Sequence, residues 1–189
     1  MTFSDIGLDN SLQKAIADLG FEEPTPIQSE SIPFLLAEEN DLIALAQTGT
    51  GKTAAFGLPI IQHIETDSKQ TQAIILCPTR ELCLQITKDM ETYAKYTKGL
   101  KITAVYGGAN IQMQIKALNY GSQIVVGTPG RVIDLIKRKK LKLGHIKYVV
   151  LDEADEMLNM GFKEDLDTIL VETPEEKRTL LFSATMPKE

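Results

Sequence analysis

The sequence predicts an α/β fold in which a mostly parallel central sheet is flanked on both faces by helices, giving three layers. Short β-rich apolar runs alternate with longer segments of helical spacing, and such strand–helix–strand alternation gives parallel strands joined by right-handed crossovers. Several runs are apolar at every position, as expected of strands covered on both faces. The length of 189 residues suits one domain.

Six strands are predicted at 42–46, 73–77, 102–106, 123–127, 148–151 and 179–182. Helical patterns fall between them, at roughly 53–64, 80–97, 110–120, 129–139 and 155–170. Two further helices, at roughly 9–19 and 26–37, precede the first strand. Sheets of this kind bind ligands at the carboxyl ends of their strands. The residues that directly follow each strand are therefore the candidates for function.

The composition excludes several classes of protein. Hydrophobic residues make up 43% and charged residues 24% of the chain, which is ordinary for a globular domain and excludes disorder, collagen and coiled coil. No apolar run is long enough for a membrane-spanning helix. The N-terminus lacks the basic head and apolar core of a signal peptide. We therefore expect a cytoplasmic protein without a membrane partner.

Charge and cysteine content restrict the binding chemistry. The formal net charge is −6, so any nucleic acid must be held by local amides, helix N-termini and a few arginines rather than by bulk attraction. Cys77 and Cys83 are too few for a disulfide framework and match no zinc spacing. His63 and His145 lie far apart in the sequence, and we interpret all four residues as structural.

A phosphate-binding loop is predicted directly after the first strand. The segment ends in Gly-Lys-Thr, as the phosphate-loop pattern requires, but has alanine at the first glycine position. Gly49 and Gly51 permit a tight turn whose amides point at phosphate, and the next helix adds its positive end. Lys52 would reach the β- and γ-phosphates, and the Thr53 hydroxyl would ligate Mg²⁺. The predicted cofactor-binding residues of this loop are Ala46, Gln47, Thr48, Gly49, Thr50, Gly51, Lys52 and Thr53. The alternative is a plain glycine-rich turn.

An acidic segment, Asp152-Glu153-Ala154-Asp155, follows the strand at 148–151. A carboxylate at this position holds Mg²⁺ in phosphate-loop enzymes, so Asp152 takes that role here, through water. Glu153 would orient and polarise the attacking water, which makes Asp152, Glu153 and Lys52 the predicted catalytic residues. The alternative is that Asp152 and Asp155 cap the next helix, which explains one carboxylate but not both Asp152 and Glu153.

These segments resemble those of the DEAD-box ATP-dependent RNA helicases of superfamily 2, in which the phosphate loop also begins with alanine. The resemblance spans Phe3 to Pro187, with the motifs in the family's order. It implies a RecA-like phosphate-loop NTPase domain, with N-terminal helices in 1–37 and a core in 41–187. Residues 20–28 look like the family's Q motif, with Phe3 as the upstream aromatic residue.

The Q-like segment has both a local and a functional interpretation. Thr25, Pro26 and Gln28 form a good capping box at a helix start. The resemblance implies in addition that Gln28 reads the adenine edge and that Phe21 packs near the ring. A glutamine amide offers the donor and the acceptor that adenine N7 and N6 require. The two roles are compatible, and together they predict a preference for ATP and ADP over guanine nucleotides.

The resemblance also implies RNA contacts after three other strands. The residues concerned are Pro78, Thr79, Arg80, Gly107, Gly108, Thr128, Pro129, Gly130 and Arg131. Locally, Thr79 and Thr128 are candidate N-caps with Pro129 at N1, so plain capping is the alternative. Amides at such helix starts can hold RNA phosphates, aided by the arginines, and such contacts ignore base identity. An acidic domain could thereby bind RNA independently of sequence.

Two further segments have alternatives. Ser183-Ala184-Thr185 closes the last strand and is locally a serine/threonine turn. The resemblance implies that its hydroxyls link to the acidic segment, including Asp155, and sense the γ-phosphate. The basic run 137–140 lies roughly 15 Å along its helix from Pro129, and cations there complement the helix dipole. We interpret that run as a solvated helix end.

The family has two RecA-like domains, and every motif here maps to the first. No His-Arg-x-Gly-Arg arginine-finger motif occurs in the sequence, and such a finger contributes about 10³–10⁵ in rate. We therefore expect a monomeric fragment that binds adenine nucleotide weakly, hydrolyses it slowly or not at all, and needs a second domain to unwind RNA. The alternatives are a nucleotide-dependent RNA-binding module without catalysis, or another phosphate-loop enzyme such as a kinase.

Overall fold

The structure, a computed structural model, describes residues 1–186, so Pro187 at the end of the predicted core lies outside the described residues. The strands are β1 (Leu42–Leu45), β2 (Ala73–Leu76), β3 (Ile102–Val105), β4 (Ile124–Gly127), β5 (Tyr148–Asp152) and β6 (Arg178–Ser183). They form one sheet in the order β1-β6-β5-β2-β4-β3. Every neighbouring pair is parallel, so the predicted mostly parallel sheet is parallel throughout the described residues.

The helices occupy the connections between the strands. A short 3₁₀ turn, η1 (Phe3–Ile6), comes first. The α-helices are α1 (Asn10–Asp18), α2 (Pro26–Ala37), α3 (Lys52–His63), α4 (Arg80–Tyr93), α5 (Ile111–Tyr120), α6 (Pro129–Lys137), α7 (Ala154–Asn159) and α8 (Lys163–Val171). The helix predicted at 26–37 is confirmed with the same bounds, whereas the one predicted at 80–97 ends four residues earlier.

The single helix predicted at 155–170 is wrong, because the chain breaks it into α7 and α8. Gly161 has φ +84°, a left-handed conformation that residues with a Cβ rarely adopt. The amide of Gly161 donates to Leu158 O at 3.0 Å, and that of Phe162 donates to Met157 O at 2.9 Å. These two bonds close the end of α7 and turn the chain, so Phe162 precedes a new helix.

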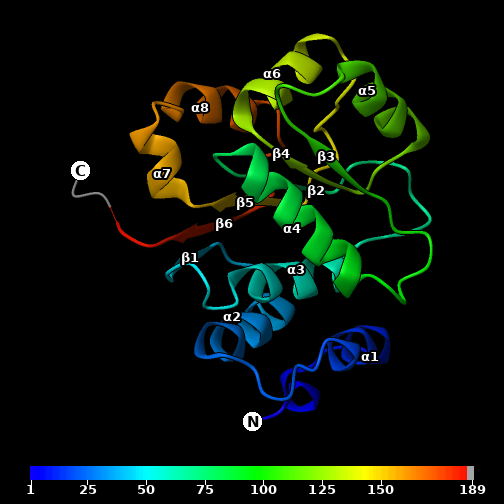
Figure 1. Cartoon of the computed structure of the whole chain (residues 1–189), viewed down its shortest axis with the longest axis vertical. Coiled ribbons are helices and arrows are strands. Elements are labelled where there is room, and N and C mark those ends of the chain that lie inside the picture. Colours follow the sequence, from blue (N-terminus) through cyan, green and yellow to red (C-terminus); the bar gives the residue numbers. More distant parts are fainter. Residues whose placement is uncertain (187–189) are drawn as a thin grey trace.

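Two hydrophobic layers enclose the sheet (Figure 1). Ile75 and Val150 pack with buried residues of α1 to α4, while Ile74 and Val149 pack with buried residues of α5 to α8. Adjacent residues of one strand thus face opposite layers, as the twofold period of a strand requires. This explains why the central strands are apolar at every position.

The predicted structural role of the cysteines agrees with their surroundings. Cys77 and Cys83 are fully buried and unbridged. The Cys83 thiol donates to Val126 O at 3.2 Å. Contact with Cys83 and burial raise the pKa of the Cys77 thiol, which keeps it protonated and unreactive. None of the helices within residues 1–186 combines the length and apolar composition needed to cross a bilayer.

A buried arginine attaches the N-terminal helices to the sheet. Arg178, at the start of β6, is 8% exposed. Its Nη1 donates to Leu35 O at 2.9 Å, and its Nε and Nη2 donate to Asn40 O at 3.1 and 2.9 Å. Leu35 lies near the end of α2 and Asn40 just before β1. One guanidinium therefore fixes the segment that leads into the predicted phosphate loop.

We predict that Arg178→Leu lowers the free energy of unfolding by about 2–4 kcal/mol, because the buried Leu35 carbonyl and the partly buried bonds to Asn40 O lose a charged donor. Urea unfolding followed by circular dichroism measures this, with the slope m expected to stay constant. The matched control is Arg138→Leu, since Arg138 is half-exposed and pairs only with Asp134 one turn away. That variant should change stability by less than about 0.5 kcal/mol. Equal losses in both variants would contradict the assigned role.

Candidate functional site at the carboxyl edge of the sheet

The predicted phosphate loop leaves β1 and enters α3 as an exposed turn with left-handed glycines. Gly49 has φ +82° and Gly51 has φ +88°. A Cβ at Gly51 would lie 2.4 Å from Gln28 Nε2, so only glycine fits there. The Thr50 hydroxyl donates to Gln47 O at 2.6 Å and fixes the turn. The loop therefore presents the first amides of α3, an arrangement that favours anions.

A buried ion pair lies beneath this loop. Lys52 Nζ is 3.4 Å from Asp152 Oδ1, and the two side chains are 8% and 2% exposed. Burial raises the pKa of Asp152, and the Lys52 ammonium opposes that rise. The pair brings the start of α3 next to the end of β5, as the sequence predicts. Thr53, the other predicted Mg²⁺ ligand, is the next residue of α3 and is partly exposed.

The acidic segment is only partly explained by helix capping. The N-cap of α7 is Glu153, which makes no side-chain capping bond, so neither Asp152 nor Asp155 occupies that position. Both carboxylates nevertheless accept amides at the helix start, Asp152 Oδ1 from Glu153 and Asp155 Oδ1 from Glu156, each at 3.0 Å. Glu153 has φ +53°, a strained conformation for a residue with a Cβ. Thr48 Oγ1 donates to Glu153 Oε1 at 3.4 Å, which holds the carboxylate over the phosphate loop. The prediction that Asp152 or Asp155 is the N-cap is therefore wrong, and capping leaves the Glu153 carboxylate unexplained.

The predicted link between the acidic segment and Ser183-Ala184-Thr185 is present. The Thr185 hydroxyl and amide both donate to Asp155 Oδ2, at 2.9 and 3.2 Å. The Asp155 amide donates to Ser183 Oγ at 3.3 Å, and that hydroxyl donates to Thr185 O at 2.6 Å. Slight burial raises the pKa of Asp155, but hydrogen bonds from Thr185 and Ser183 outweigh it and hold the pKa below its usual value. Ala184 lies between the two hydroxyls.

Gln28 connects helix α2 to the phosphate loop. Its Oε1 accepts from the Thr25 amide at 3.0 Å, which is the glutamine half of the predicted capping box. Its Nε2 donates to Gly51 O at 3.2 Å, a contact that local sequence patterns do not reveal. The side chain is 3% exposed. Within residues 1–186, the buried Thr25 Oγ1 has no hydrogen-bond partner. The capping prediction thus holds for Gln28.

The two aromatic residues of the Q-like segment lie together. The rings of Phe3 and Phe21 stack with centroids 6.2 Å apart, and the Tyr93 ring tilts against Phe21 at 6.4 Å. Phe3 is buried and Phe21 is 37% exposed. Phe21 therefore presents part of its ring to solvent. The adenine contact assigned to Phe21 and Gln28 stays a prediction.

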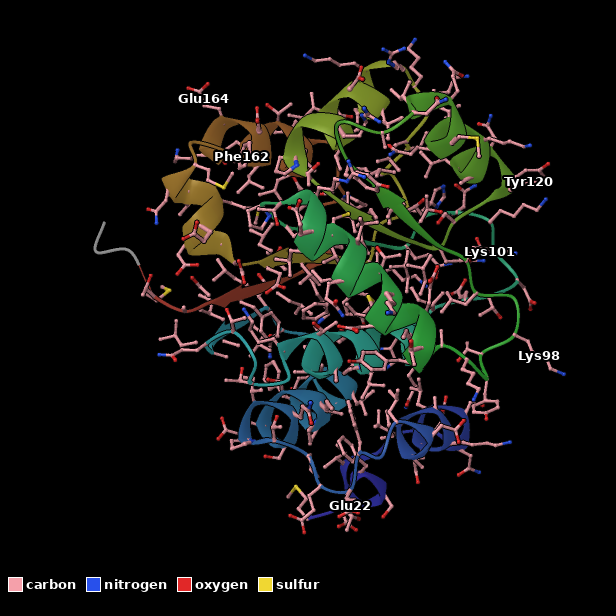
Figure 2. All side chains as sticks on the ribbon, viewed as in Figure 1. Glu22, Lys98, Lys101, Tyr120, Phe162 and Glu164 are labelled. Carbon is pink, nitrogen blue, oxygen red and sulfur yellow. The ribbon has the colours of Figure 1, made fainter. Side chains whose placement is uncertain are left out.

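A separate groove of about 450 Å³ gathers most of the predicted RNA-binding residues. Its walls include Pro78, Arg80, Gly107, Thr128, Gly130 and Arg131. They come from the ends of three different strands, as the parallel sheet requires. The groove is also lined by two residues that the sequence did not single out, Asp134 and Phe162. Phe162 follows the break between α7 and α8 (Figure 2).

The two helix starts at this groove differ. Thr79 Oγ1 accepts from the Leu82 amide at 3.2 Å, so capping is confirmed there. Thr128 is the N-cap of α6 but makes no side-chain capping bond, and its hydroxyl is therefore not used in that way. Pro129 occupies the first turn of α6, as predicted. Capping thus accounts for Thr79 alone.

The two arginines of the groove are held in different ways. Arg131 Nη1 donates to Gln114 Oε1 at 2.9 Å, and both terminal nitrogens donate to Ala109 O at 3.2 Å. The Arg80 guanidinium lies over the Tyr106 ring, 5.1 Å from its centroid. Gly108 lies beside Arg80, since a Cβ at Gly108 would be 3.8 Å from Arg80 Nη1. The groove is thus positively charged and already ordered.

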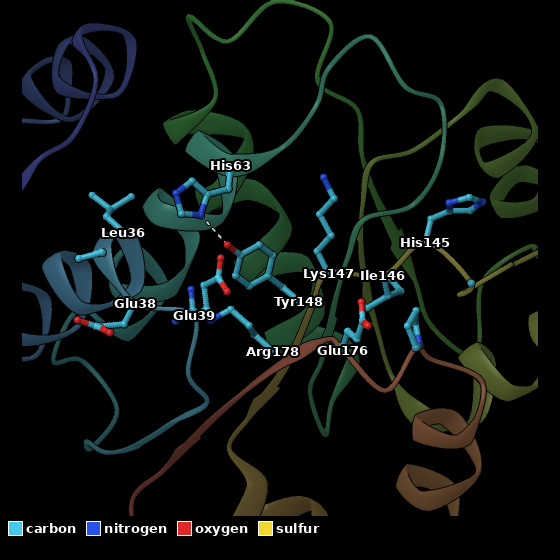
Figure 3. A pocket seen from close by; sticks show the side chains of 13 residues that line it. Leu36, Glu38, Glu39, His63, His145, Ile146, Lys147, Tyr148, Glu176 and Arg178 are labelled. Carbon is cyan, nitrogen blue, oxygen red and sulfur yellow. Dashed lines mark hydrogen bonds between the residues drawn. The ribbon is translucent and has the colours of Figure 1, made fainter.

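A cavity of about 810 Å³, larger than the groove, lies at the opposite edge of the sheet and contains none of the predicted site residues (Figure 3). His63 Nδ1 is hydrogen-bonded to the Tyr148 hydroxyl there. Burial, with the nearby cations of Arg178 and Lys147, lowers the pKa of His63 and keeps the ring neutral. Arg178 is the structural arginine described above. Size alone therefore does not mark the functional site.

Comparison with known proteins identifies the family to which the chain is similar. The family model described as DEAD/DEAH box helicase matches residues 25–189. The "ATP-dependent RNA helicase CshA" of Limosilactobacillus reuteri is 57% identical over 189 residues, which cover the whole chain and 38% of that protein. The "ATP-dependent RNA helicase DeaD" of Escherichia coli K12 is 50% identical over 187 residues, which cover 99% of the chain and 30% of that protein. The chain thus spans about a third of the length of these relatives.

A solved structure shows the same fold. The DEAD box protein from the hyperthermophile Methanococcus jannaschii matches with a TM-score of 0.95 and 49% identity, over the whole chain and 51% of that protein. A second structure, a hypothetical ATP-dependent RNA helicase from Sulfolobus tokodaii, matches with a TM-score of 0.87 and 36% identity. The predicted RecA-like fold is therefore confirmed. Taken with the site geometry, these matches show that the chain belongs to the DEAD/DEAH box helicase family.

Proposed function

We propose that this chain is the N-terminal ATP-binding domain of an ATP-dependent RNA helicase, which couples ATP binding and hydrolysis to local unwinding of RNA duplexes. One observation carries the proposal. The buried Lys52–Asp152 pair under the phosphate loop and the arginine-lined groove lie at the same edge of the sheet. The relatives named above are ATP-dependent RNA helicases, which supports the same class of enzyme.

The loop residues fit a nucleotide with Mg²⁺. The amides at the start of α3 would bind the phosphates, and Lys52 would contact the β- and γ-phosphates. The Thr53 hydroxyl and the Asp152 carboxylate are the hard oxygen donors that Mg²⁺ prefers. The burial that raises the pKa of Asp152 also favours a cation beside it. Bound Mg²⁺ would neutralise charge on the phosphates. Glu153 would hold and polarise the attacking water.

Gln28 would select adenine while it holds the loop. Its amide uses one N–H toward Gly51 O and one lone pair toward the Thr25 amide. One N–H and one lone pair stay available, and this is the capacity that recognition of adenine N7 and N6 needs. Phe21 would pack near the ring with its exposed part. Base recognition and loop position would then depend on the same side chain.

RNA would bind in the groove through its backbone. The helix starts at Arg80 and Pro129 offer amides to phosphate, and Arg80 and Arg131 add positive charge. Such contacts carry no base information, so binding would be independent of sequence. This explains how a chain with a net charge of −6 could hold RNA.

Unwinding would require a second RecA-like domain that completes the site over ATP and RNA. The sequence here holds no arginine-finger motif, so the chain alone should hydrolyse ATP slowly and should not separate strands. That the chain is a monomer is a separate part of the proposal. The bonds between Asp155 and Thr185 would transmit the nucleotide state toward the segment that leaves β6. A cytoplasmic location is part of the same proposal.

We predict that the chain binds ADP with Mg²⁺, and binds GDP at least tenfold more weakly, in calorimetric titrations. Lys52→Ala should lower the affinity for ADP at least tenfold, which is about 1.4 kcal/mol of binding free energy, because the phosphates lose their cation. Lys88→Ala, which removes an exposed lysine of α4, is the control and should leave ADP binding unchanged. Equal affinity for ADP and GDP would contradict the adenine assignment.

Gln28→Ala separates the two roles of Gln28. If Gln28 reads adenine, the variant loses the preference for ADP over GDP. If Gln28 only positions Gly51, the variant lowers the affinities for ADP and GDP by the same factor and keeps the preference for ADP. Calorimetry of both nucleotides with this variant distinguishes these outcomes. An unchanged affinity for both would show that Gln28 serves neither role.

The hydrogen bonds at Asp155 predict a pH effect of defined sign. The folded pKa is lowered, so the stabilisation from these bonds is present above the usual pKa of about 3.9 and is lost as pH falls through the lower folded value. A ¹³C NMR titration of the Asp155 carboxyl should give a pKa below that usual value. Thr185→Val should raise it toward the usual value, because a donor is lost. Thr168→Val, at an exposed position of α8, should leave it unchanged.

A further inference from the structure

A small depression of about 230 Å³ at the opposite edge of the sheet from the phosphate loop gathers positive charge. Four lysines line it, from the loop before β2 and from the loop after α6. These residues, here termed the lysine cluster, are Lys69, Lys139, Lys140 and Lys142. The end of α5, with Leu118 and Asn119, forms another wall. No role described so far uses this surface.

The lysine cluster carries unbalanced charge. All four lysines are exposed, and none forms a salt bridge within the described part of the chain. Asp134 and Glu65, which precede these two loops in the sequence, are paired with other cations, Arg138 at 2.8 Å and Lys147 at 2.7 Å. Asp67, two residues from Lys69, is the remaining acidic neighbour in sequence. Like charges gathered in one depression repel each other, and a polyanion would relieve that repulsion.

The backbone fixes the loop that carries three of these lysines. Lys139 has φ +58°, and the amides of Lys140 and Leu141 both donate to Leu135 O, at 2.9 and 3.2 Å. Leu141 and Leu143 are each 3% exposed and anchor the loop in the core. The interpretation of 137–140 as a solvated helix end is therefore right for Lys137 and Arg138 only. Lys139 and Lys140 lie beyond α6, in a turn that backbone bonds hold.

An exposed aromatic residue directly follows the wall of the depression that the end of α5 forms. Tyr120 is 70% exposed and directly follows Asn119. Gly121, with φ +99°, turns the chain so closely that a Cβ there would be 2.9 Å from Lys69 Cβ. Figure 2 shows Tyr120 at the periphery of the molecule. Surfaces that bind single-stranded nucleic acid typically combine positive charges along the sugar-phosphate backbone with aromatic rings on which the bases stack.

We propose that the lysine cluster and Tyr120 form a second RNA-contact surface, which binds phosphates of a single-stranded segment flanking the RNA in the groove. Helix α6 joins the two sites, with Thr128 and Gly130 in the groove and Lys139 in the lysine cluster. Its nine residues span roughly 13 Å, about four nucleotides at 3.4 Å each. One RNA strand could therefore contact both. The surface depends on the proposed function only in that the groove binds RNA.

The test compares a hexamer and a 20-mer of oligouridylate, each fluorescently labelled, by anisotropy with this chain in 50 mM salt. The test variant carries Lys139→Gln, Lys140→Gln and Lys142→Gln. The control variant carries Lys14→Gln, Lys88→Gln and Lys163→Gln, three exposed lysines elsewhere, and reaches the same net charge. We expect the test variant to bind the 20-mer at least fivefold more weakly than the wild-type chain does, and the hexamer less than twofold more weakly. The control should weaken either RNA less than twofold.

Salt dependence and stacking give two further readouts. The slope of log K against log salt for the 20-mer should become shallower by about 2 in the test variant, since each lost phosphate contact changes it by about 0.7. Tyr120→Ala should weaken the 20-mer severalfold, whereas Tyr120→Phe should retain binding because the ring is kept. Thermal unfolding of each variant confirms that the exposed substitutions leave the fold intact.

Several outcomes would overturn the proposal. An equal loss of affinity for the 20-mer in the test and control variants would show an effect of net charge alone. A wild-type chain that binds the 20-mer no more tightly than the hexamer would show that no second contact exists. Displacement of the 20-mer by poly-glutamate as effectively as by unlabelled RNA would show a surface for acidic polypeptides. Arg80→Gln tests the groove separately, because failure to weaken the hexamer would refute the proposed groove without affecting the lysine-cluster comparison.

Discussion

The common direction of the six strands is the constraint on which the rest of this structure depends. Because every pair is parallel, the residues that follow the strands meet at one edge. The register places Leu45 beside Ser183 and Asp152 beside Phe182. A slip of one residue would turn each apolar side chain to the wrong layer. The same packing that buries the strands therefore brings together the phosphate loop, the acidic segment and the hydroxyls of Ser183 and Thr185.

At this edge, unfavourable local conformations are maintained by long-range contacts. Asp152 is buried although its carboxylate would prefer water, and Lys52 beneath the loop compensates. Glu153 keeps a left-handed backbone that places its carboxylate beside Thr48. Gln28 holds the loop from a helix far from it in sequence. Strain at Glu153 and buried charge at Lys52 and Asp152 thus meet where chemistry is proposed, although Arg178 and the left-handed Lys139 show that neither feature is confined to that edge.

Features set by local chemistry were predictable from the sequence, and features set by tertiary contacts were not. Apolar runs located all six strands within a residue or two, and the proline and capping residues located α2. The break at Gly161 was missed because a helical pattern continues across it. Asp134 lies one turn after Gly130 on α6 and was overlooked, although helical spacing could have indicated it. Phe162 joins the groove only through the fold, because the break between α7 and α8 brings it beside the ends of β2 to β4. Likewise, Lys69 lies beside the loop after α6 only in the folded chain, because the two are far apart in the sequence. The sequence therefore identified motifs better than the contacts between them.

The fixed position of Arg131 has a consequence for how the groove distinguishes its ligands. Its guanidinium is already bonded to Gln114 and to the Ala109 carbonyl, so it has little rotamer freedom to lose when a ligand arrives. A preformed surface binds nearly as a rigid body, which favours fast association and little rearrangement. Arg131 therefore cannot reject an unsuitable strand by failing to rearrange. If the groove binds RNA as proposed, selection at this arginine would follow the curvature and phosphate spacing of the strand.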